Sequence, residues 1–327
     1  MAAITMSENL YDIIIVGGGS AGLTAALYAS RQNLRTLVIT KDIGGQALLT
    51  DHIENYPGFD VIGGFELVSK FEEQAKAFGA QFAYDEVSSI VERENVCFTV
   101  KTPNGEYDTC AVVLAFGKTP RDLGVPGEEK LKGKGVSYCA VCDGPLFKAK
   151  SVAIVGSGDP ALDAASLLSN VAGKVYLIHT WEKPLGDGQT LESLKTNPKV
   201  EFISFAHVIE ILGDKSVGGV LVEDSKTKQH REVRLDGVFV ELGYVAKTDF
   251  LKDLVRLNGK KEIEVDKECA TSHSGIFAAG DVTDVPFKQA VISAGQGAIA
   301  ALSAYNYIQR LRGGSAVRAD WKTKKKA

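Results

Sequence analysis

A glycine-rich turn between a strand-like run and a helix-like run constrains this chain more than any other feature. Residues 11–16 form a short β-branched run, the pattern of a buried parallel strand. Residues 17–22 follow with the spacing G-x-G-x-x-G, and residues 21–31 are rich in alanine and leucine, as in a helix. Residues 36–40 then predict a second strand. The segment as a whole predicts a βαβ unit.

Each glycine of this turn has its own physical role. Gly17 permits the tight turn, Gly19 lets the backbone approach a pyrophosphate, and Gly22 allows close packing of helix on strand. The free N–H groups at the start of the helix favour phosphate. The turn therefore predicts dinucleotide binding. It does not decide between FAD and NAD, because Thr40 and Lys41 stand where an acidic ribose ligand is usual.

The same order of elements returns later in the chain. A strand, a glycine turn, a helix and a second strand are expected at residues 151–155, 156–158, 161–169 and 174–178. Two nucleotide-binding-type units with alternating strands and helices predict a doubly wound α/β architecture. Residues 97–102 and 217–223 are bounded by polar turns and are expected to be added antiparallel strands.

A second element near the C-terminus favours FAD. Residues 275–282 form an apolar strand that ends in Gly280 and is followed at once by Asp281. Ligands of such folds bind at the carboxyl ends of the strands, where this carboxylate could accept a hydroxyl of a ribityl chain or ribose. The alternative is that Asp281 only caps a helix by accepting backbone N–H groups.

The reactive element is the pair Cys139 and Cys142, followed by Asp143. Two intervening residues allow an intrachain disulfide and lower the pKa of one thiol, and the carboxylate could exchange a proton with a departing thiolate. A metal site would need a second pair or a Cys/His couple, and the five histidines are dispersed, so no metal is expected. The other cysteines, Cys97, Cys110 and Cys269, are expected to be unreactive thiols.

Composition excludes several classes of protein. The chain has 327 residues, enough for about two domains. The net charge of −4 does not suggest a nucleic acid as partner. No apolar run is long enough for a membrane span, and residues 1–9 lack the features of a secretion signal. We therefore expect a cytoplasmic protein without a membrane partner.

Together the motifs resemble those of low-molecular-weight thioredoxin reductases, the class II FAD-dependent pyridine nucleotide-disulfide oxidoreductases, over nearly the whole chain. The matching segments are residues 17–22, 44–46, 54–58, 139–144, 156–158, 275–282 and 288–290. The element CxxCDG just before the second glycine turn is specific to this group, since larger relatives carry their cysteines early in the first domain.

The resemblance implies two Rossmann-like domains. A discontinuous FAD-binding domain covers residues 1–118 and 248–327, and an NAD(P)-type domain with the cysteine pair, residues 119–247, is inserted between its halves. The residues implied for FAD are Gly17, Gly19, Ser20, Ala21, Gly22, Gly45, Gln46, Asn55, Ala115, Gly117, Gly280, Asp281, Lys288, Gln289 and Ala290. A pyridine nucleotide, where one is used, would lie at Gly156, Gly158 and Ala161.

The resemblance also implies roles for the reactive residues. Cys142 faces the flavin, Cys139 attacks the disulfide of a partner protein, and Asp143 is the general acid. The inserted domain of the family rotates to expose the flavin and the cysteines in turn, and the family is usually homodimeric.

The electron-donor site departs from the family. Members that use NADPH carry an arginine cluster, His-Arg-Arg and a further Arg, where this chain has residues 179–185 with the sequence HTWEKPL. Each lost charge-assisted phosphate contact is worth about 1.5–3 kcal/mol, and Glu182 adds negative charge. The sequence thus favours a donor other than NADPH. NADH, a ferredoxin-like reductant, and NADPH rescued by Lys183 stay open.

The sequence predicts a flavoenzyme that passes electrons through FAD and the Cys139–Cys142 disulfide to a thioredoxin or a glutaredoxin-like protein. One alternative is a flavin oxidase or a ferredoxin–NADP reductase-like enzyme, although those relatives lack the cysteine pair. The other is an FAD-binding redox sensor, which would undergo one stoichiometric oxidation instead of steady turnover.

Overall fold

The computed structural model describes residues 10–49, 53–93 and 97–315, apart from the side chains of Leu49 and Cys142. The chain separates into two compact units. The first unit comprises Met1–Lys118 and Ala246–Ala327, and the second comprises Thr119–Val245. The expected domain limits were 118 and 247. The assignment of FAD to one unit and of a pyridine nucleotide to the other stays a prediction.

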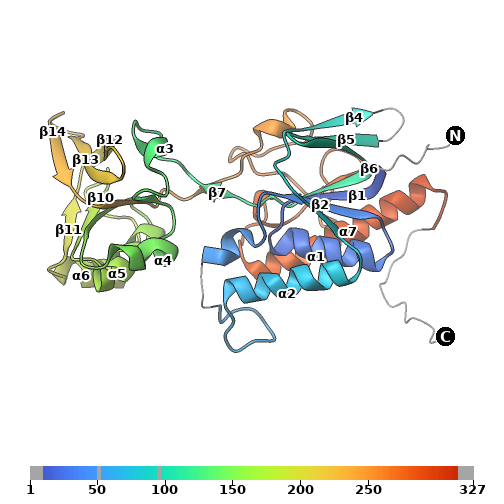
Figure 1. Ribbon diagram of the computed structural model, residues 1–327, viewed down its shortest axis with the longest axis horizontal. Coiled ribbons are helices and arrows are strands. Elements are labelled where there is room, and N and C mark those ends of the chain that lie inside the picture. Colours follow the sequence, from blue (N-terminus) through green and yellow to red (C-terminus); the bar gives the residue numbers. More distant parts are fainter. Residues whose placement is uncertain (1–9, 50–52, 94–96, 316–327) are drawn as a thin grey trace. The chain divides into compact units, whose positions relative to one another are not determined.

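The first unit is built on a mixed sheet with the strand order β3-β2-β1-β6-β5-β4, in which β17 also pairs with β6 (Figure 1). Its parallel strands are β1 (Leu10–Val16), β2 (Thr36–Thr40), β3 (Gln81–Tyr84), β6 (Gly105–Leu114) and β17 (Ile276–Ala278). The strands β4 (Ser89–Arg93) and β5 (Cys97–Thr102) add an antiparallel meander to the first half of β6.

The sequence of strand β1 is apolar at nearly every position, because both faces of the strand are buried. Ile13 and Ile15 pack with the helices α1 (Ser20–Arg31), α2 (Gly64–Ala77) and α7 (Ala290–Leu311) on one face of the sheet. Ile14 and Val16 point to the other face, where β4, β5 and residues 246–263 cover them. A strand buried on both faces needs apolar side chains at both parities.

The second unit has a parallel sheet in the order β11-β10-β9-β15-β8 and a separate antiparallel sheet in the order β12-β13-β14 (Figure 1). The parallel strands are β8 (Val136–Ser137), β9 (Ser151–Val155), β10 (Lys174–Ile178), β11 (Val200–Ile203) and β15 (Gly237–Val240). The antiparallel strands are β12 (Ala206–Gly213), β13 (Val217–Asp224) and β14 (His230–Arg234).

The second unit also contains helices and one pair of short strands. Its helices are α3 (Glu128–Leu131), α4 (Ala140–Asp143), η2 (Gly144–Phe147), α5 (Asp159–Val171) and α6 (Gly188–Thr196). The strands β7 (Thr119–Pro120) and β16 (Tyr244–Val245) pair where the chain enters and leaves this unit. The first unit also contains the 3-10 turns η1 (Gly45–Leu49), η3 (Asp249–Leu251) and η4 (Gly280–Val282).

The predicted α/β fold class is confirmed, and β2, β5, β9 and β10 have the predicted bounds. The layers differ in one respect from a doubly wound arrangement. In each unit the long helices lie on one face of the parallel sheet, whereas antiparallel strands help to cover the other, together with α3 in the second unit. The strands expected at 97–102 and 217–223 belong to these covering layers, which bury the second apolar face in place of helices.

Helices α1 and α7 pack with very little space between them. A Cβ atom at Gly297 of α7 would lie 2.1 Å from the carbonyl oxygen of Ala21 in α1. Gly295, on the same helix, is exposed and has open space at its Cβ position.

Within the described ranges, no helix is both long enough and apolar enough to cross a membrane.

The contrast between the crowded Gly297 and the exposed Gly295 gives a matched pair of substitutions. We expect Gly297→Ala to lower the free energy of unfolding by at least about 2 kcal/mol, because the new methyl group meets backbone that cannot move aside. Gly295→Ala should raise it by about 0.5–1 kcal/mol, since alanine has the higher helix propensity. Urea unfolding of both variants measures the difference. Equal effects would show that α1 and α7 are not in close contact.

Candidate functional site

The predicted dinucleotide turn has the tight geometry that its glycines suggest. Gly17 has a φ of 114°, and a Cβ atom there would lie 2.4 Å from the carbonyl oxygen of Ala115. A Cβ atom at Gly22 would lie 1.9 Å from the carbonyl oxygen of Gly17. At Gly19 the nearest atom to a Cβ position is the carbonyl oxygen of Gly44, at 3.9 Å. There is therefore no space for a side chain at Gly17 or Gly22, whereas the space beside Gly19 is open.

The start of α1 is suited to an anion. Gly19 is its N-cap residue, and no side chain caps the helix there. The first turn of α1 contains no acidic residue. Its N–H groups and the positive end of the helix dipole are thus available to a phosphate that approaches over Gly19.

Segments distant in the sequence converge on this turn. The Gly44 N–H donates to the carbonyl oxygen of Gly18 at 2.8 Å, which places Gly45 next to Gly19. A Cβ atom at Gly280 would lie 2.9 Å from Cβ of Ala21. The structure therefore brings the two ends of the first unit together at the N-terminus of α1.

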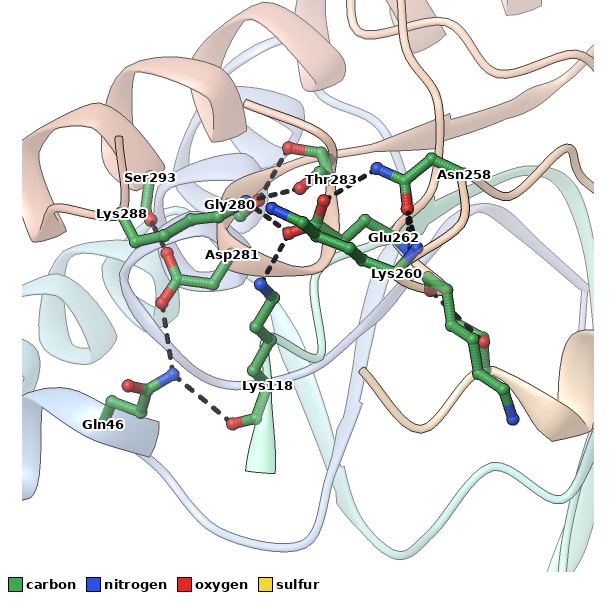
Figure 2. A network of polar contacts seen from close by, with 12 residues as sticks. Gln46, Lys118, Asn258, Lys260, Glu262, Gly280, Asp281, Thr283, Lys288 and Ser293 are labelled. Atoms are coloured by element: carbon green, nitrogen blue, oxygen red, sulfur yellow. Dashed lines mark hydrogen bonds and ion pairs between the residues drawn. The ribbon is translucent and has the colours of Figure 1, made fainter. Parts of the chain in front are cut away.

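Asp281 occupies a defined polar position beside this turn (Figure 2). Its Oδ1 accepts a hydrogen bond from the Ser293 hydroxyl at 3.2 Å, and its Oδ2 accepts one from Nε2 of Gln46 at 3.1 Å. No side chain caps η4 or α7, so the alternative role as a helix cap is not what Asp281 does. A carboxylate has about four acceptor positions, and Asp281 can still accept a ligand hydroxyl.

A buried charge cluster lies next to Asp281 (Figure 2). Oε1 of Glu262 lies 2.6 Å from Nζ of Lys118 and 3.3 Å from Nζ of Lys288, and its Oε2 accepts from Nδ2 of Asn258 at 2.8 Å. Burial alone would raise the pKa of Glu262. The hydrogen bonds from Lys118 and Asn258, with the charge of Lys288, outweigh burial and lower this pKa to about 2.

The cluster holds the loops around Asp281 in place. The Lys118 carbonyl oxygen accepts from Nε2 of Gln46 at 3.4 Å, and Nζ of Lys288 donates to the carbonyl oxygen of Thr283 at 2.6 Å. Burial, and next the charge of Lys118, lower the pKa of Lys288. The sequence analysis missed Lys118, Glu262 and Asn258. Lys118 and Glu262 are 144 residues apart, and no local pattern marks them as partners.

The other residues predicted for FAD also belong to the first unit. Ser20 and Ala21 are the buried first residues of α1. Nδ2 of Asn55 donates to Oε1 of Gln289 at 3.1 Å. Gln289 is the N-cap residue of α7, which starts at Ala290. Gly117, with a φ of 65°, lies just before Lys118. These positions fit a flavin dinucleotide, with its pyrophosphate at α1 and a hydroxyl at Asp281.

The reactive residues and the second glycine turn lie in the second unit. The strands β8, β9, β10 and β15 are parallel, so the residues that follow them share one edge of the sheet. Cys139 comes after β8, Gly156 directly after β9, His179 after β10 and Glu241 after β15. The structure thus brings the cysteine segment and the second turn to the same edge.

Cys139 is disulfide-bonded, while Cys97, Cys110 and Cys269 are free thiols. The backbone N–H of Cys139 donates to the Ser137 hydroxyl at 3.1 Å, and its carbonyl oxygen accepts from the N–H of Asp143 at 3.1 Å. The side chain of Cys142 lies outside the described part of the chain, so its pairing and its position stay predictions. Asp143 is half-buried at the end of α4.

The second glycine turn keeps its close packing and is hydrogen-bonded to the loop that follows β10. A Cβ atom at Gly156 would lie 2.3 Å from the carbonyl oxygen of Glu241 and 3.0 Å from Cβ of Ala161. Gly158 is the N-cap residue of α5, without a side-chain cap. In the loop, the N–H of Leu185 donates to the carbonyl oxygen of Ser157 at 2.6 Å.

Acidic residues lie at this edge of the second unit. Asp159 in the first turn of α5 accepts from the N–H of Asp187 at 2.7 Å. Burial, and next the charge of Asp163, raise the pKa of Glu241 to about 7. His179 is buried, and burial lowers its pKa. Within the described ranges, no His, Cys, Asp or Glu cluster could hold a metal ion.

The chain is similar to known redox proteins over almost its whole length. Residues 11–297 match the family described as pyridine nucleotide-disulphide oxidoreductase. A thioredoxin reductase of Treponema pallidum is 44% identical over 307 residues, which cover 93% of this chain and 99% of the relative.

Solved structures show the same similarity. Thioredoxin reductase of Lactococcus lactis has a TM-score of 0.79 and 34% identity, covering 92% of this chain and 99% of that chain. A ferredoxin-flavin thioredoxin reductase of Clostridium acetobutylicum has a TM-score of 0.53 and 33% identity, covering 94% and 100%.

The Glu262 cluster yields a pH-dependent prediction. We expect Glu262→Gln to lower the free energy of unfolding by about 3 kcal/mol at pH 7, because Lys118 and Lys288 lose a buried counter-charge. The pKa of Glu262 is lowered from 4.5 to about 2 by folding. The stabilisation is therefore complete above pH 4.5 and is lost as the pH falls toward 2.

Urea unfolding of the wild-type protein and the variant between pH 7 and pH 3.5 measures this effect, and the difference between the two should narrow below pH 4.5 without closing, because pH 3.5 is still above the folded-state pKa of about 2. Glu264→Gln is the control, since Glu264 is more exposed and its nearest contact with Arg256 is 3.8 Å. It should change stability by less than about 0.5 kcal/mol. A constant difference across the pH range would contradict the assignment.

Proposed function

Because this chain belongs to the pyridine nucleotide-disulphide oxidoreductase family, we propose that it is an FAD-dependent enzyme that reduces the disulfide of thioredoxin. The observation that carries the proposal is the disulfide at Cys139 in the CxxCD segment, in a chain whose other three described cysteines are free thiols. Thioredoxin is the partner that the names of the similar proteins give. A glutaredoxin-like protein would present the same kind of disulfide.

The first unit supplies the flavin site in this proposal. The N–H groups at the start of α1, beside Gly19, would hold the pyrophosphate, and Asp281 would accept a hydroxyl of the ribityl chain or ribose. Gln46 and Ser293 orient the Asp281 carboxylate through the two hydrogen bonds described above. FAD, when bound, supplies the two electrons that reduce the cysteine pair.

The cysteine pair transfers these electrons by thiol–disulfide exchange. The Cys139 thiolate attacks one sulfur of the thioredoxin disulfide, and the other thioredoxin sulfur leaves as a thiolate. The Cys142 thiolate then attacks Sγ of Cys139, which releases the second thioredoxin thiolate and restores the disulfide. Asp143 provides the proton for a departing thiolate in its role as general acid.

Apolar side chains around the pair suit a protein substrate. Val141 is 49% exposed and Leu146 is 68% exposed, and both lie within a few residues of Cys139. Exposed apolar groups beside a reactive disulfide give a docking partner something to bury.

We further propose a cytoplasmic location and a homodimer, both from the family resemblance.

We also propose that the donor is not NADPH. The loop after β10 lies against the second glycine turn through Leu185, and Thr180 and Trp181 stand at the arginine positions of the NADPH-dependent members. Asp159 is in the first turn of the helix that follows this glycine turn, and the backbone of Glu241 lies against Gly156. A 2′-phosphate would therefore meet negative charge without an arginine to bind it. The similar ferredoxin-flavin thioredoxin reductase suggests a ferredoxin as the donor.

The test of the main proposal is turnover with thioredoxin disulfide, with a chemically reduced viologen dye as the electron source and thiol formation as the readout. Cys139→Ser and Cys142→Ser should each lower the rate by at least about 10³-fold, as expected when a covalent nucleophile is removed. Both should still bind FAD. Cys269→Ser, which removes a buried thiol outside the pair, should keep the wild-type rate.

Two results would contradict the proposal. One equivalent of thiol formed without further turnover would indicate a redox sensor. Undiminished electron transfer to oxygen in the cysteine variants, without thioredoxin reduction by the wild-type protein, would indicate a flavin oxidase.

The donor proposal is tested by anaerobic titration of the flavin absorbance with NADPH, NADH and reduced ferredoxin. We expect bleaching by ferredoxin and little bleaching by one equivalent of NADPH. Thr180→Arg/Trp181→Arg should strengthen NADPH binding by at least about tenfold, since each arginine adds a charge-assisted contact. Thr180→Gln/Trp181→Gln is the control and should not. Full bleaching of the wild-type protein by NADPH would refute the donor proposal and leave the reductase proposal intact.

A further inference from the structure

A second pair of cysteines lies in the first unit, on neighbouring strands. Cys97 is the first residue of β5, and Cys110 lies within the second half of β6. The two strands are antiparallel and lie side by side (Figure 1). Phe98 is paired with Thr109, so Cys97 and Cys110 are the next pair in the same register. The cysteines are therefore close in space although 12 residues separate them in the chain.

The side chains of this pair meet. On the same face, Thr99 and Asp108 are opposite each other and their side chains are hydrogen-bonded at 2.7 Å. Cys97 has a φ of 62°, which departs from regular strand geometry, so the register alone would not prove contact. Two further findings place the side chains together: Cys97 packs against the buried cluster that contains Cys110, and a hydrogen bond between the thiols is the main cause of both of their pKa shifts. Residues opposite each other on antiparallel strands have Cα atoms about 4.5–5.5 Å apart, within the range of about 4.4–6.8 Å for a disulfide.

The hydrogen bond makes the two thiols chemically different. The Cys110 S–H donates to Sγ of Cys97, and this bond lowers the pKa of Cys97 to about 7 although burial and the charge of Glu92 oppose it. The same bond, with burial, raises the pKa of Cys110. Cys97 is half-buried and Cys110 is buried. Cys97 is thus the thiolate that a small reagent can reach, and Cys110 is a thiol held against it.

Charged and titratable groups surround the pair on several elements. Glu92 lies on β4, and its charge acts to raise the pKa of Cys97. Tyr307 lies on α7, and its pKa is raised by burial and next by the charge of Cys97. Arg312 follows α7 and is paired with Asp12 of β1, and these two act in opposite directions on the pKa of Cys110. The positive charge of Arg312 lowers the pKa of Cys110, whereas the thiolate at Cys97 is favoured by the hydrogen bond from Cys110.

We propose that Cys97 and Cys110 are a second redox site, which a hydroperoxide oxidises to a disulfide independently of Cys139. The Cys97 thiolate attacks one oxygen of hydrogen peroxide, the O–O bond breaks, and hydroxide leaves, so that Cys97 becomes a sulfenic acid. Sγ of Cys110 then attacks Sγ of Cys97, the S–O bond breaks, and a second hydroxide leaves. The two protons come from the two thiols, so the products are one disulfide and two waters.

The oxidation is reversible by thiol–disulfide exchange. A dithiol reductant attacks the new disulfide, and both cysteines return to thiols while the reductant becomes a disulfide. The site therefore records exposure to peroxide in the unit that carries the proposed flavin residues. Formation of its disulfide uses no electron from a flavin.

Trypsin separates the two cysteine pairs cleanly, which makes the test direct. Cleavage after Arg93, Lys101 and Lys118 places Cys97 and Cys110 on different peptides, whereas Cys139 and Cys142 stay together on the peptide that ends at Lys148. The reduced holoenzyme is treated with hydrogen peroxide, free thiols are alkylated, and the digest is analysed by mass spectrometry without reduction. We expect a cross-linked species of peptides 94–101 and 102–118, which dithiothreitol removes.

Variants test the assigned roles. Cys97→Ser and Cys110→Ser should each abolish the cross-linked species, and Cys110→Ser should leave Cys97 as a sulfenic acid that dimedone traps. Cys269→Ser is the control and should keep the cross-link. Cys269 is buried, its Sγ donates to the carbonyl oxygen of Gln296 at 3.6 Å, and burial raises its pKa to about 12. Alkylation of Cys97 at pH 7 should be at least tenfold slower in Cys110→Ala, because the stabilising donor is lost (about tenfold per pKa unit).

The proposal fails if Cys97 and Cys110 stay reduced while Cys139 and Cys142 oxidise. It also fails if Cys97 is alkylated as slowly as Cys269, or if Cys110→Ala leaves the alkylation rate unchanged. These readouts use no electron donor and no thioredoxin, so they are independent of the reductase activity proposed above.

Discussion

The first unit depends on how closely helix α1 lies to its neighbours. Cβ atoms at Gly22, Gly297 and Gly280 would come within 1.9, 2.1 and 2.9 Å of backbone or side-chain atoms around α1. Only glycine fits at such positions. Because α7 and the turn after β17 can approach this closely, α7 is held against α1, and Asp281 lies beside the N-terminus of α1.

Close packing alone would not fix the loops that carry polar groups, and the Glu262 cluster does this. One buried carboxylate binds two lysines and an asparagine, so its charge is compensated and its lone pairs are used. A buried ion pair needs such additional hydrogen bonds to offset desolvation. The Lys118 carbonyl oxygen also accepts a hydrogen bond from the Gln46 side chain, and the Lys288 side chain donates one to the Thr283 carbonyl oxygen. Segments from four parts of the sequence are thereby held around Asp281.

Local patterns predicted much of this arrangement, and long-range contacts were beyond them. The glycine turns, the parallel strands and the position of Asp281 follow from apolar runs and glycine spacing, which are visible within about 30 residues. The Glu262 cluster joins residues more than 100 positions apart, and nothing near Lys118 indicates its partner. The covering layers were also hidden, because an apolar strand face shows only that it is buried and not whether helices or strands bury it.

The cysteines show the same limit in chemical terms. Cys139 and Cys142 are two residues apart in a recognisable motif, so their chemistry could be predicted from spacing. Cys97 and Cys110 looked like isolated thiols, because a contact between them requires the antiparallel register of β5 and β6. Cys269 is the third such thiol and is paired with a carbonyl oxygen instead. Burial and strand position alone therefore do not make a cysteine inert. Its reactivity depends on whether the nearest polar atom is a carbonyl group or a second thiol that can donate to it.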